Sequence, residues 1–343
     1  MIERFHGGLR EDSLDFSVNL NPFIDESVTR DLVCKYYKKA IKYPEQRGKS
    51  LIQSISNKYN IPEENIILGN GSIEIFYLLP RVLQVDEIFT LEPTFSEYRY
   101  VAKINKCDYV PIKPVSEFEW DMEKLSKRLD KKSLLFICNP NNPTGNLFER
   151  KKILKLLKTG AFIVVDEAFI DFSLENESLI KDVINFKNLI VVKSLTKIYS
   201  IAGLRIGFCV ASKKIVRELN RNLPLWNVNA LALAISKDFL LNDDLIINTK
   251  RLVKKEKEFI LKSFENCSYI KLFDTHANFF LAHSDKTPEL INFLSSNNIA
   301  VREYKGFYGL DKKYFRFAIK KHEENEQLVD LIKKFYSFER TNI

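Results

Sequence analysis

Residues 189–211 read LIVVKSLTKIYSIAGLRIGFCVA, and in this stretch two apolar runs flank Lys197. The runs 189–195 and 204–211 are short and nearly unbroken, which is typical of strands buried on both faces of a sheet. An ammonium group among small and apolar neighbours tends to lose its proton, and a neutral lysine amine attacks carbonyl groups. The stretch therefore predicts buried strands and a reactive lysine. A helix start with an incidental lysine is the alternative.

Short apolar runs that alternate with amphipathic stretches extend from about residue 50 to 235. Further candidate strands are EIFTLEP (87–93), LLFICNP (134–140) and FIVVDEAF (162–169), and the stretches 96–107 and 147–159 between them have helical spacing. Buried strands that alternate with helices indicate a mostly parallel sheet covered on both faces. The prediction is a large, doubly wound α/β domain.

Polar residues gather where these strands end. Ligands of open α/β sheets bind outside the carboxyl ends of the strands, so we expect the chemistry at one edge of the sheet. The polar groups are Glu92 and Pro93, Asn139 to Gly145, Asp166 and Glu167, and Ser194 to Lys197.

After about residue 236 the strands become shorter and the helices more charged, which indicates a separate α+β module. The expected organisation is an N-terminal arm (1–45) that packs with the small domain, a large domain (46–235) and a small C-terminal domain (236–343). A chain of 343 residues, 45% of them hydrophobic, is long enough for two such cores.

Composition limits the function classes. The net charge is +8, but 45 acidic residues are interleaved with 53 basic ones, so we expect no nucleic-acid partner. The five cysteines lack close pairing and the four histidines show no ligand spacing with them, so neither disulfides nor a metal site is expected. No run approaches the roughly 20 apolar residues of a membrane span. These features favour a cytoplasmic protein without a membrane partner.

Four segments carry a more specific signal: GNGSIE (69–74), CNPNNPTG (138–145), DEAFIDF (166–172) and SLTKIYSIAGLRIG (194–207). In this order and spacing they resemble the fold-type-I pyridoxal 5′-phosphate (PLP) enzymes, the superfamily of aspartate aminotransferase and the class I and II aminotransferases. The resemblance covers almost the whole chain and implies that Lys197 holds PLP covalently and shuttles protons. It also implies that Arg205 binds the cofactor phosphate, a task that suits a planar guanidinium.

The resemblance assigns further roles at the cofactor. Asp166, with Lys197 the second catalytic residue, pairs with the pyridinium nitrogen, and Asn142 hydrogen-bonds the phenolic oxygen of the ring. Phe95 stacks on the ring face, with an ordinary core phenylalanine as the alternative. Many relatives have a tyrosine where this chain has Phe169, which leaves Asn142 as the side-chain donor to the phenolic oxygen. The remaining expected cofactor contacts are Gly71, Ser72, Ile73, Ser194 and Thr196.

Tyr43, in KYPEQRG, matches a tyrosine that in relatives reaches the cofactor phosphate of the neighbouring subunit. The match implies a homodimer with shared active sites.

Two branches of the superfamily are the best matches, and both act on phosphorylated substrates. HGG (6–8), LDFSVNLNPF (14–23), the phenylalanines in PTFSEY and DEAFIDF, and residues 309–328 resemble the threonine-phosphate decarboxylases of cobalamin synthesis. That resemblance implies decarboxylation of L-threonine O-3-phosphate to (R)-1-amino-2-propanol O-2-phosphate. The alternative is a histidinol-phosphate aminotransferase with 2-oxoglutarate as acceptor. A non-catalytic PLP-fold protein is disfavoured, because Lys197, Asp166, Asn142 and Arg205 are all present.

The same resemblance places four residues at the substrate. Arg316 and Arg302 are expected to hold the substrate phosphate, and His6 and Asn19 from the arm are expected at the substrate. For each arginine the alternative is a surface salt bridge, and Arg316 fits it less well because it alternates with apolar residues on a strand. The segment between HGG and LDFSVN is shorter than the decarboxylase pattern, so an ordinary arm histidine is the alternative for His6.

Overall fold

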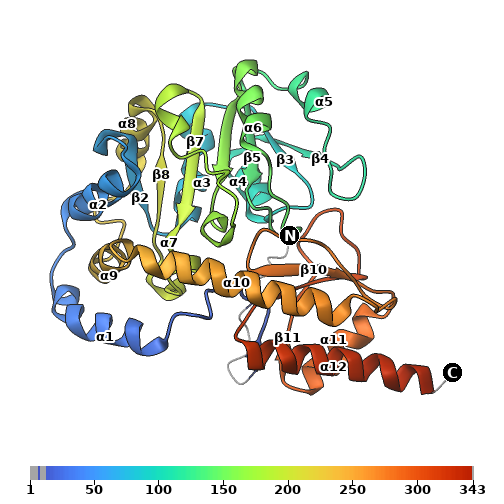
Figure 1. Ribbon diagram of the computed structural model, residues 1–343. Helices are drawn as coiled ribbons and strands as arrows, with labels where there is room; N and C mark the ends of the chain where they lie inside the picture. Colours follow the sequence, from blue (N-terminus) through green and yellow to red (C-terminus); the bar gives the residue numbers. More distant parts are fainter. Residues whose placement is uncertain (1–6, 8–12, 342–343) are drawn as a thin grey trace.

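The computed structural model describes residue 7 and residues 13–341, with the side chains described up to residue 337 (Figure 1). Its larger sheet has seven strands in the order β2-β8-β7-β6-β5-β3-β4. Neighbouring strands are parallel except β8, which runs antiparallel to both β2 and β7. The strands are β2 (Ile66–Gly69), β3 (Glu87–Leu91), β4 (Asp108–Ile112), β5 (Ser133–Cys138), β6 (Phe162–Asp166), β7 (Leu189–Ser194) and β8 (Gly207–Val210). The predicted doubly wound, mostly parallel sheet is confirmed.

Helices cover both faces of this sheet, and each face has its own core. Consecutive strand residues point to opposite faces, so Val191 packs in one core and Val192 in the other. The helices of this part are α2 (Lys49–Tyr59), α3 (Ser72–Leu83), α4 (Glu97–Asn105), α5 (Met122–Ser126), α6 (Arg150–Leu156), α7 (Leu195–Ile198), α8 (Lys213–Asn222) and α9 (Ala230–Leu240). Short 3₁₀ turns lie at η1 (Tyr37–Ile41), η2 (Gln46–Gly48), η3 (Glu63–Asn65), η4 (Leu157–Thr159), η5 (Ile170–Phe172), η6 (Asp182–Asn185) and η7 (Ala202–Leu204).

The expected strand 204–211 begins three residues later than predicted. Residues 202–204 form η7, and Arg205 has a left-handed backbone with φ 55°, so β8 starts only at Gly207. A non-glycine residue with positive φ interrupts an extended strand. Edge strand β4 is absent from the predicted set, because its residues are only half-buried and do not form an apolar run.

The second sheet has four antiparallel strands in the order β12-β13-β10-β9. They are β9 (Lys271–Leu272), β10 (Phe279–His283), β12 (Arg302–Glu303) and β13 (Tyr314–Ala318), and the accompanying helices are α10 (Asp243–Phe264), α11 (Thr287–Ser296) and α12 (His322–Thr341). The long helix α10 runs from beneath the large sheet to the small one (Figure 1). The predicted domain bounds stay a prediction, and residue 236 lies inside α9.

The N-terminal arm contacts both parts of the molecule. Strand β1 (Leu14–Asp15) pairs in parallel with β11 (Ile299–Ala300) of the small part. Helix α1 (Glu26–Tyr36) begins at the cap Asp25, whose side chain accepts from the Ser27 amide, and it lies against α9 through a hydrogen bond from Tyr36 to Asp238. The arm therefore reaches the junction between the two sheets.

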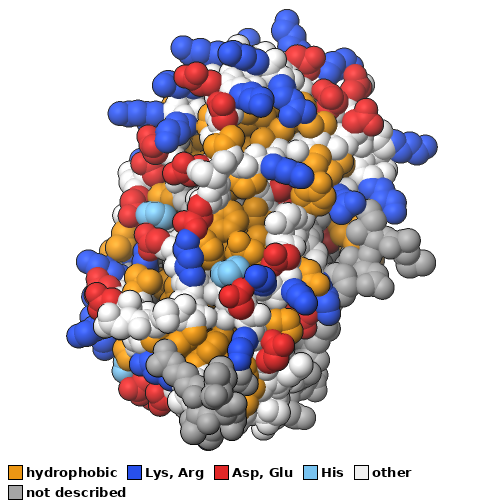
Figure 2. Space-filling view, turned by 90° about the vertical axis from the view of Figure 1, so that its right-hand side faces the viewer, with side chains coloured by type: hydrophobic (Ala, Val, Ile, Leu, Met, Phe, Trp, Pro, Cys, Tyr) orange, Lys and Arg blue, Asp and Glu red, His pale blue; other side chains and the backbone are white. Residues whose placement is uncertain are grey.

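Basic and acidic side chains are interspersed on the face shown in Figure 2, where they surround patches of apolar side chains. Within residues 13–341, no helix combines the length and the apolar character that crossing a bilayer requires.

Candidate active site

A cavity of 420 Å³ lies at the carboxyl ends of the central strands and draws its walls from the arm, the large sheet and the small sheet. Nine residues expected at the cofactor or substrate line it, although they are spread over almost 300 positions of the sequence. They are Asn19, Ile73, Phe95, Asn142, Phe169, Lys197, Arg205, Arg302 and Arg316. The other lining residues are Gly7, Ser17, Val18, Ser96, Glu97 and Phe307.

Lys197 lies in the single turn α7, directly after β7, and is half-buried. Its Nζ donates a hydrogen bond to Thr196 Oγ1 at 3.0 Å. Burial lowers the pKa of Lys197 to about 8; Arg205 and Arg316 act in the same direction, and Asp166 opposes them. A larger fraction of this amine is neutral near pH 7 than for an exposed lysine, which suits a nucleophile.

Asp166 ends strand β6 and is buried. Its Oδ2 accepts a hydrogen bond from Tyr98 Oη at 2.7 Å, and its Oδ1 accepts from the Ala168 amide at 3.0 Å. Burial raises the pKa of Asp166 to about 6, although both hydrogen bonds and Lys197 lower it. A cation bound opposite this carboxylate would favour its charged form.

Tyr98 is a site residue that the sequence analysis missed. It lies three residues after Phe95, and the two rings meet edge to face with centroids 5.5 Å apart. Residues three apart share one face of a helical turn, so this spacing was the available signal. Tyr98 is fully buried and also stacks on Phe136.

The start of α3 and Arg205 together form an anion cradle. Gly71 caps α3 with φ 75°, and a Cβ at Gly71 would lie only 2.8 Å from Arg205 Nη2. A larger residue would therefore push the guanidinium away from the backbone amides at the start of α3, which begins at Ser72. Helix starts and arginines both favour phosphate groups. Nearby, the buried hydroxyls of Ser194 and Thr196 are hydrogen-bonded at 2.7 Å.

Asn142 and Phe169 complete the wall between the cofactor residues and the arginines. Asn142 Oδ1 accepts a hydrogen bond from Arg316 Nη1 at 2.6 Å, so its amide nitrogen is the end that can donate into the cavity. Phe169 packs edge to face on Phe279 and contributes an apolar surface.

Arg302 and Arg316 lie directly opposite each other on the antiparallel strands β12 and β13, and both are buried. Arg316 Nη2 donates to the Ser17 carbonyl at 2.6 Å, whereas its buried Nε has no hydrogen-bond partner among the described residues. Burial and the charge of Arg302 lower the pKa of Arg316 to about 9. Two buried cations repel, and a bound anion would relieve that repulsion. The buried Asn19 Oδ1 likewise has no partner among the described residues.

Six of the expected residues that the structure describes do not line this cavity: Asp166, Gly71, Ser72, Ser194, Thr196 and Tyr43. The first five lie within three residues of a lining residue along the chain. The Tyr43 side chain is 80% exposed and stacks on Trp226 with ring centroids 4.3 Å apart. His6 lies outside the described residues, so its expected role stays a prediction.

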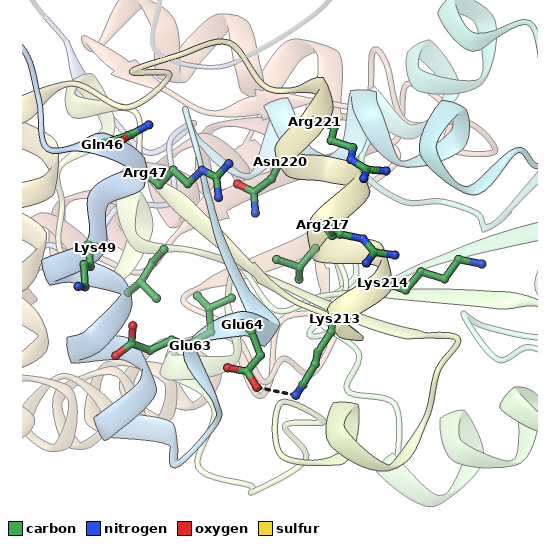
Figure 3. Close-up of a pocket in the computed structure, with 13 residues that line it drawn as sticks. Gln46, Arg47, Lys49, Glu63, Glu64, Lys213, Lys214, Arg217, Asn220 and Arg221 are labelled. Carbon is green, nitrogen blue, oxygen red and sulfur yellow. Dashed lines mark ion pairs between the residues drawn. The ribbon is translucent and has the colours of Figure 1, made fainter.

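A larger hollow of 1170 Å³ contains none of the predicted site residues (Figure 3). It lies between α2 and α8, its charged side chains are exposed, and Lys213 pairs with Glu64 at 2.6 Å. Its charged residues are Arg47, Lys49, Glu63, Glu64, Lys213, Lys214, Arg217 and Arg221. Exposed charges are well solvated and keep ordinary reactivity, so the smaller cavity around Lys197 is the candidate active site.

The donor set of the smaller cavity suits a planar aldehyde cofactor that carries a phosphate. The cavity is lined by an amine with a lowered pKa, by an aromatic ring and by Arg205 of the anion cradle. The buried carboxylate of Asp166 does not line it but is close enough to Lys197 to influence its pKa. Each group matches one functional group of PLP: the aldehyde, the ring nitrogen, the ring face and the phosphate.

Comparison with known proteins agrees with this chemistry. The family described as aminotransferase class I and II matches residues 14–332. The adenosylcobalamin biosynthesis bifunctional protein CobDQ of Leptospira interrogans is 34% identical over 95% of this chain, and the match spans 39% of that relative's length. A histidinol-phosphate aminotransferase of Flavobacterium johnsoniae is 33% identical, with 85% of each chain covered.

A solved structure shows the same architecture. The histidinol-phosphate aminotransferase of Clostridium acetobutylicum superposes with a TM-score of 0.87 at 27% identity, covering 94% of this chain and 98% of its own. The chain therefore belongs to the class I and II aminotransferase family, whose members depend on pyridoxal phosphate.

Proposed function

We propose that the protein decarboxylates L-threonine O-3-phosphate to (R)-1-amino-2-propanol O-2-phosphate. The observation that carries the proposal is the buried pair Arg302 and Arg316, which lines the same cavity as Lys197. Two buried guanidinium groups favour a dianionic phosphate. Arg316 Nε, which has no partner within residues 7 and 13–341, is one donor toward it. The substrate amine would then approach the Lys197 end of the cavity.

The cofactor residues keep the roles that their chemistry suggests. PLP, when bound, supplies an electron sink for the bond that breaks at the substrate Cα. Lys197 holds the cofactor covalently and afterwards carries a proton to and from the substrate. Asp166 keeps the ring nitrogen protonated, and Arg205 with the start of α3 binds the cofactor phosphate. Phe95 packs on the ring face, and Asn142 donates to the phenolic oxygen.

The two arginines also bear on which bond breaks. A bond at Cα breaks when it stands perpendicular to the conjugated ring. If Arg302 and Arg316 hold the phosphate, neither holds the α-carboxylate in the plane of the ring, so the carboxylate is free to take the perpendicular position. Lys197 then returns a proton to Cα after carbon dioxide has left.

Two further observations support the decarboxylase. The relative named for adenosylcobalamin biosynthesis aligns with 95% of this chain, although the chain spans only 39% of it. Phe169 is a buried apolar wall of the cavity, in agreement with the decarboxylase-like sequence around it.

A histidinol-phosphate aminotransferase is the second candidate. The Flavobacterium relative of that name aligns over 85% of both chains. The two proteins are therefore similar in length, whereas the bifunctional relative is much longer than this chain. Its substrate also carries a phosphate and an amine, and it would use the same residues. Only turnover separates the two candidates.

The proposed enzyme is a homodimer. Tyr43 and Trp226 form an exposed aromatic stack, and other large apolar side chains are also exposed in the neighbouring segments. Exposed apolar patches of this kind are typical of protein interfaces. The neighbouring exposed residues are Tyr37, Ile41 and Leu225.

The deciding experiment incubates the purified protein and PLP with L-threonine O-3-phosphate in the absence of any keto acid. We expect aminopropanol phosphate and carbon dioxide by mass spectrometry, and neither product with Lys197→Ala. No product, together with turnover of histidinol phosphate once 2-oxoglutarate is added, would establish the aminotransferase instead.

A further inference from the structure

Asn21, in the N-terminal arm, makes an unusually complete set of hydrogen bonds to the segment that carries Lys197. It is 1% exposed. Its backbone amide donates to the Lys197 carbonyl at 3.0 Å, and its Nδ2 donates to the Ile198 carbonyl and to Thr249 Oγ1, both at 2.8 Å. Its Oδ1 accepts from the Phe23 amide at 3.0 Å. Every polar group of this buried amide is therefore engaged.

These bonds reach a segment that cannot position itself. Helix α7 is a single turn of four residues, and a helix this short has no stability of its own in water. The place of its carbonyl groups must come from tertiary contacts. Asn21 supplies two such contacts, at Lys197 and at the next residue, Ile198.

The third bond extends to the small sheet. Thr249 is buried on α10, and Glu256 on the same helix accepts hydrogen bonds from His322 and Asn325 of α12. Helix α10 thus connects the Asn21 contact with the part of the molecule that carries Arg302 and Arg316 (Figure 1).

We propose that Asn21 is a positioning residue: it holds α7 so that Lys197 stays withdrawn from water, and it ties that lysine to the helix leading to the substrate arginines. The inference rests on the proposed role of Lys197. The arm, through the side chain of Asn21, would hold Lys197 in this position before any cofactor binds.

The test uses Asn21→Ala, which removes both side-chain donations and keeps the backbone hydrogen bond to Lys197. In the cofactor-free protein, the rate at which an amine-directed reagent labels Lys197 is followed against pH by peptide mass spectrometry. The wild-type midpoint is expected near the lowered pKa of about 8, and the variant midpoint should rise toward the ordinary 10.5 as water reaches the ammonium. A rise of one pH unit lowers the neutral fraction at pH 7 about tenfold.

Asn188→Ala is the matched control. Asn188 also donates from Nδ2 to two backbone carbonyls, those of Leu157 at 3.0 Å and Ala161 at 2.7 Å, and it does not line the active-site cavity. It should leave the Lys197 midpoint unchanged. Thr249→Val, which is nearly isosteric, removes only the bond to α10; we expect a smaller rise, and it replaces Asn21→Ala if that variant does not fold.

The outcomes separate this inference from the proposed function. An Asn21→Ala midpoint equal to the wild-type value, or an equal rise in Asn188→Ala, would overturn the positioning role. If Asn21→Ala does not fold, an unchanged midpoint in Thr249→Val has the same meaning. A wild-type protein that never takes up PLP at Lys197 would refute the proposed function, while the midpoints of the cofactor-free proteins still decide the role of Asn21.

Discussion

At the scale of single residues, burial shifts the pKa values of Lys197 and Asp166 in opposite directions. It lowers the pKa of Lys197 to about 8 and raises that of Asp166 to about 6, because low polarity disfavours the charged form of either group. Each group partly offsets the shift of the other, but burial has the larger effect on both. Both are therefore prepared for a ligand that supplies an aldehyde and a cationic ring nitrogen.

Asp166→Asn should stabilise the cofactor-free protein at pH 7. The folded pKa of about 6 lies above the ordinary 3.8, so the stability contributed by protonated Asp166 is present below pH 3.8 and is lost as the pH rises to 6. Ionisation of Asp166 then lowers the free energy of unfolding by up to about 3 kcal/mol at pH 7. The neutral asparagine avoids this loss, although it keeps only one of the two acceptor oxygens that Tyr98 and Ala168 use. Chemical denaturation should show a gain of about 1–3 kcal/mol at pH 7, together with weaker PLP binding.

The exposed Asp31→Asn serves as the control and should change stability by less than about 0.5 kcal/mol. A cofactor-free Asp166→Asn protein less stable than wild type at pH 7 contradicts the argument.

Arg316→Ala should separate substrate binding from cofactor binding. It removes a guanidinium whose Nε has no hydrogen-bond partner in the described part of the chain, but Lys197, Asp166 and Arg205 remain. We expect a near-normal visible absorbance of bound PLP and a loss of about tenfold or more in affinity for the phosphorylated substrate. Saturation kinetics measure this, with the exposed Arg30→Ala as control. If the dependence of rate on substrate concentration is unchanged in Arg316→Ala, Arg316 does not bind the substrate.

At the scale of elements, strand β7 carries a second buried lysine. Lys193 lies four residues before Lys197, and its Nζ is 2.8 Å from Asp171 Oδ1 and 3.9 Å from Glu167 Oε2. Glu167 also accepts from the Ser178 hydroxyl at 2.7 Å. This network holds the segment that follows Asp166. The sequence does not indicate this network, because a lysine within an apolar run carries no information about its partners.

Lys193→Met should destabilise the protein strongly. Lys193 and Glu167 are almost completely buried, so removing the ammonium leaves a buried carboxylate without its cation. The expected loss is about 3–5 kcal/mol in the free energy of unfolding. Denaturant titration measures it, and Lys152→Met, which breaks an exposed pair with Glu149, should cost less than about 1 kcal/mol. Equal effects of the two substitutions would show that the buried network contributes little.

At the scale of the whole molecule, the question is whether the exposed Tyr43 contributes to the active site of the neighbouring subunit. Mixed dimers of Lys197→Ala and Tyr43→Ala subunits test this. If Tyr43 serves the neighbouring site, each mixed dimer has one intact site, and random mixing restores about a quarter of the wild-type activity. If Tyr43 acts within its own subunit or not at all, mixing restores nothing beyond the sum of the two variants. Exchange of subunits is checked by native mass spectrometry.

Five of the seven strands of the large sheet could be predicted because they depend on local pattern; β2 and β4 were not among the predicted strands. Buried parallel strands need unbroken apolar runs, and β5 and β7 have them. Helix α1 was missed, since it buries none of its residues and shows no strong periodicity. Motif order and spacing distinguish the loops of Lys197, Asp166, Asn142 and Arg205, and three of these residues line one cavity, while their roles at the cofactor stay a prediction.

The amino-acid sequence by itself determined the α/β fold, the family and the residues expected at the cofactor, since all three depend on short segments with their own chemistry. Only the tertiary structure decided which distant groups meet: Arg302 opposite Arg316, Tyr98 on Asp166, and Asn21 on the Lys197 segment. Such contacts depend on how the arm, the large sheet and α10 pack together. Hydrogen bonding and desolvation act over a few ångströms in space, whatever the separation along the chain.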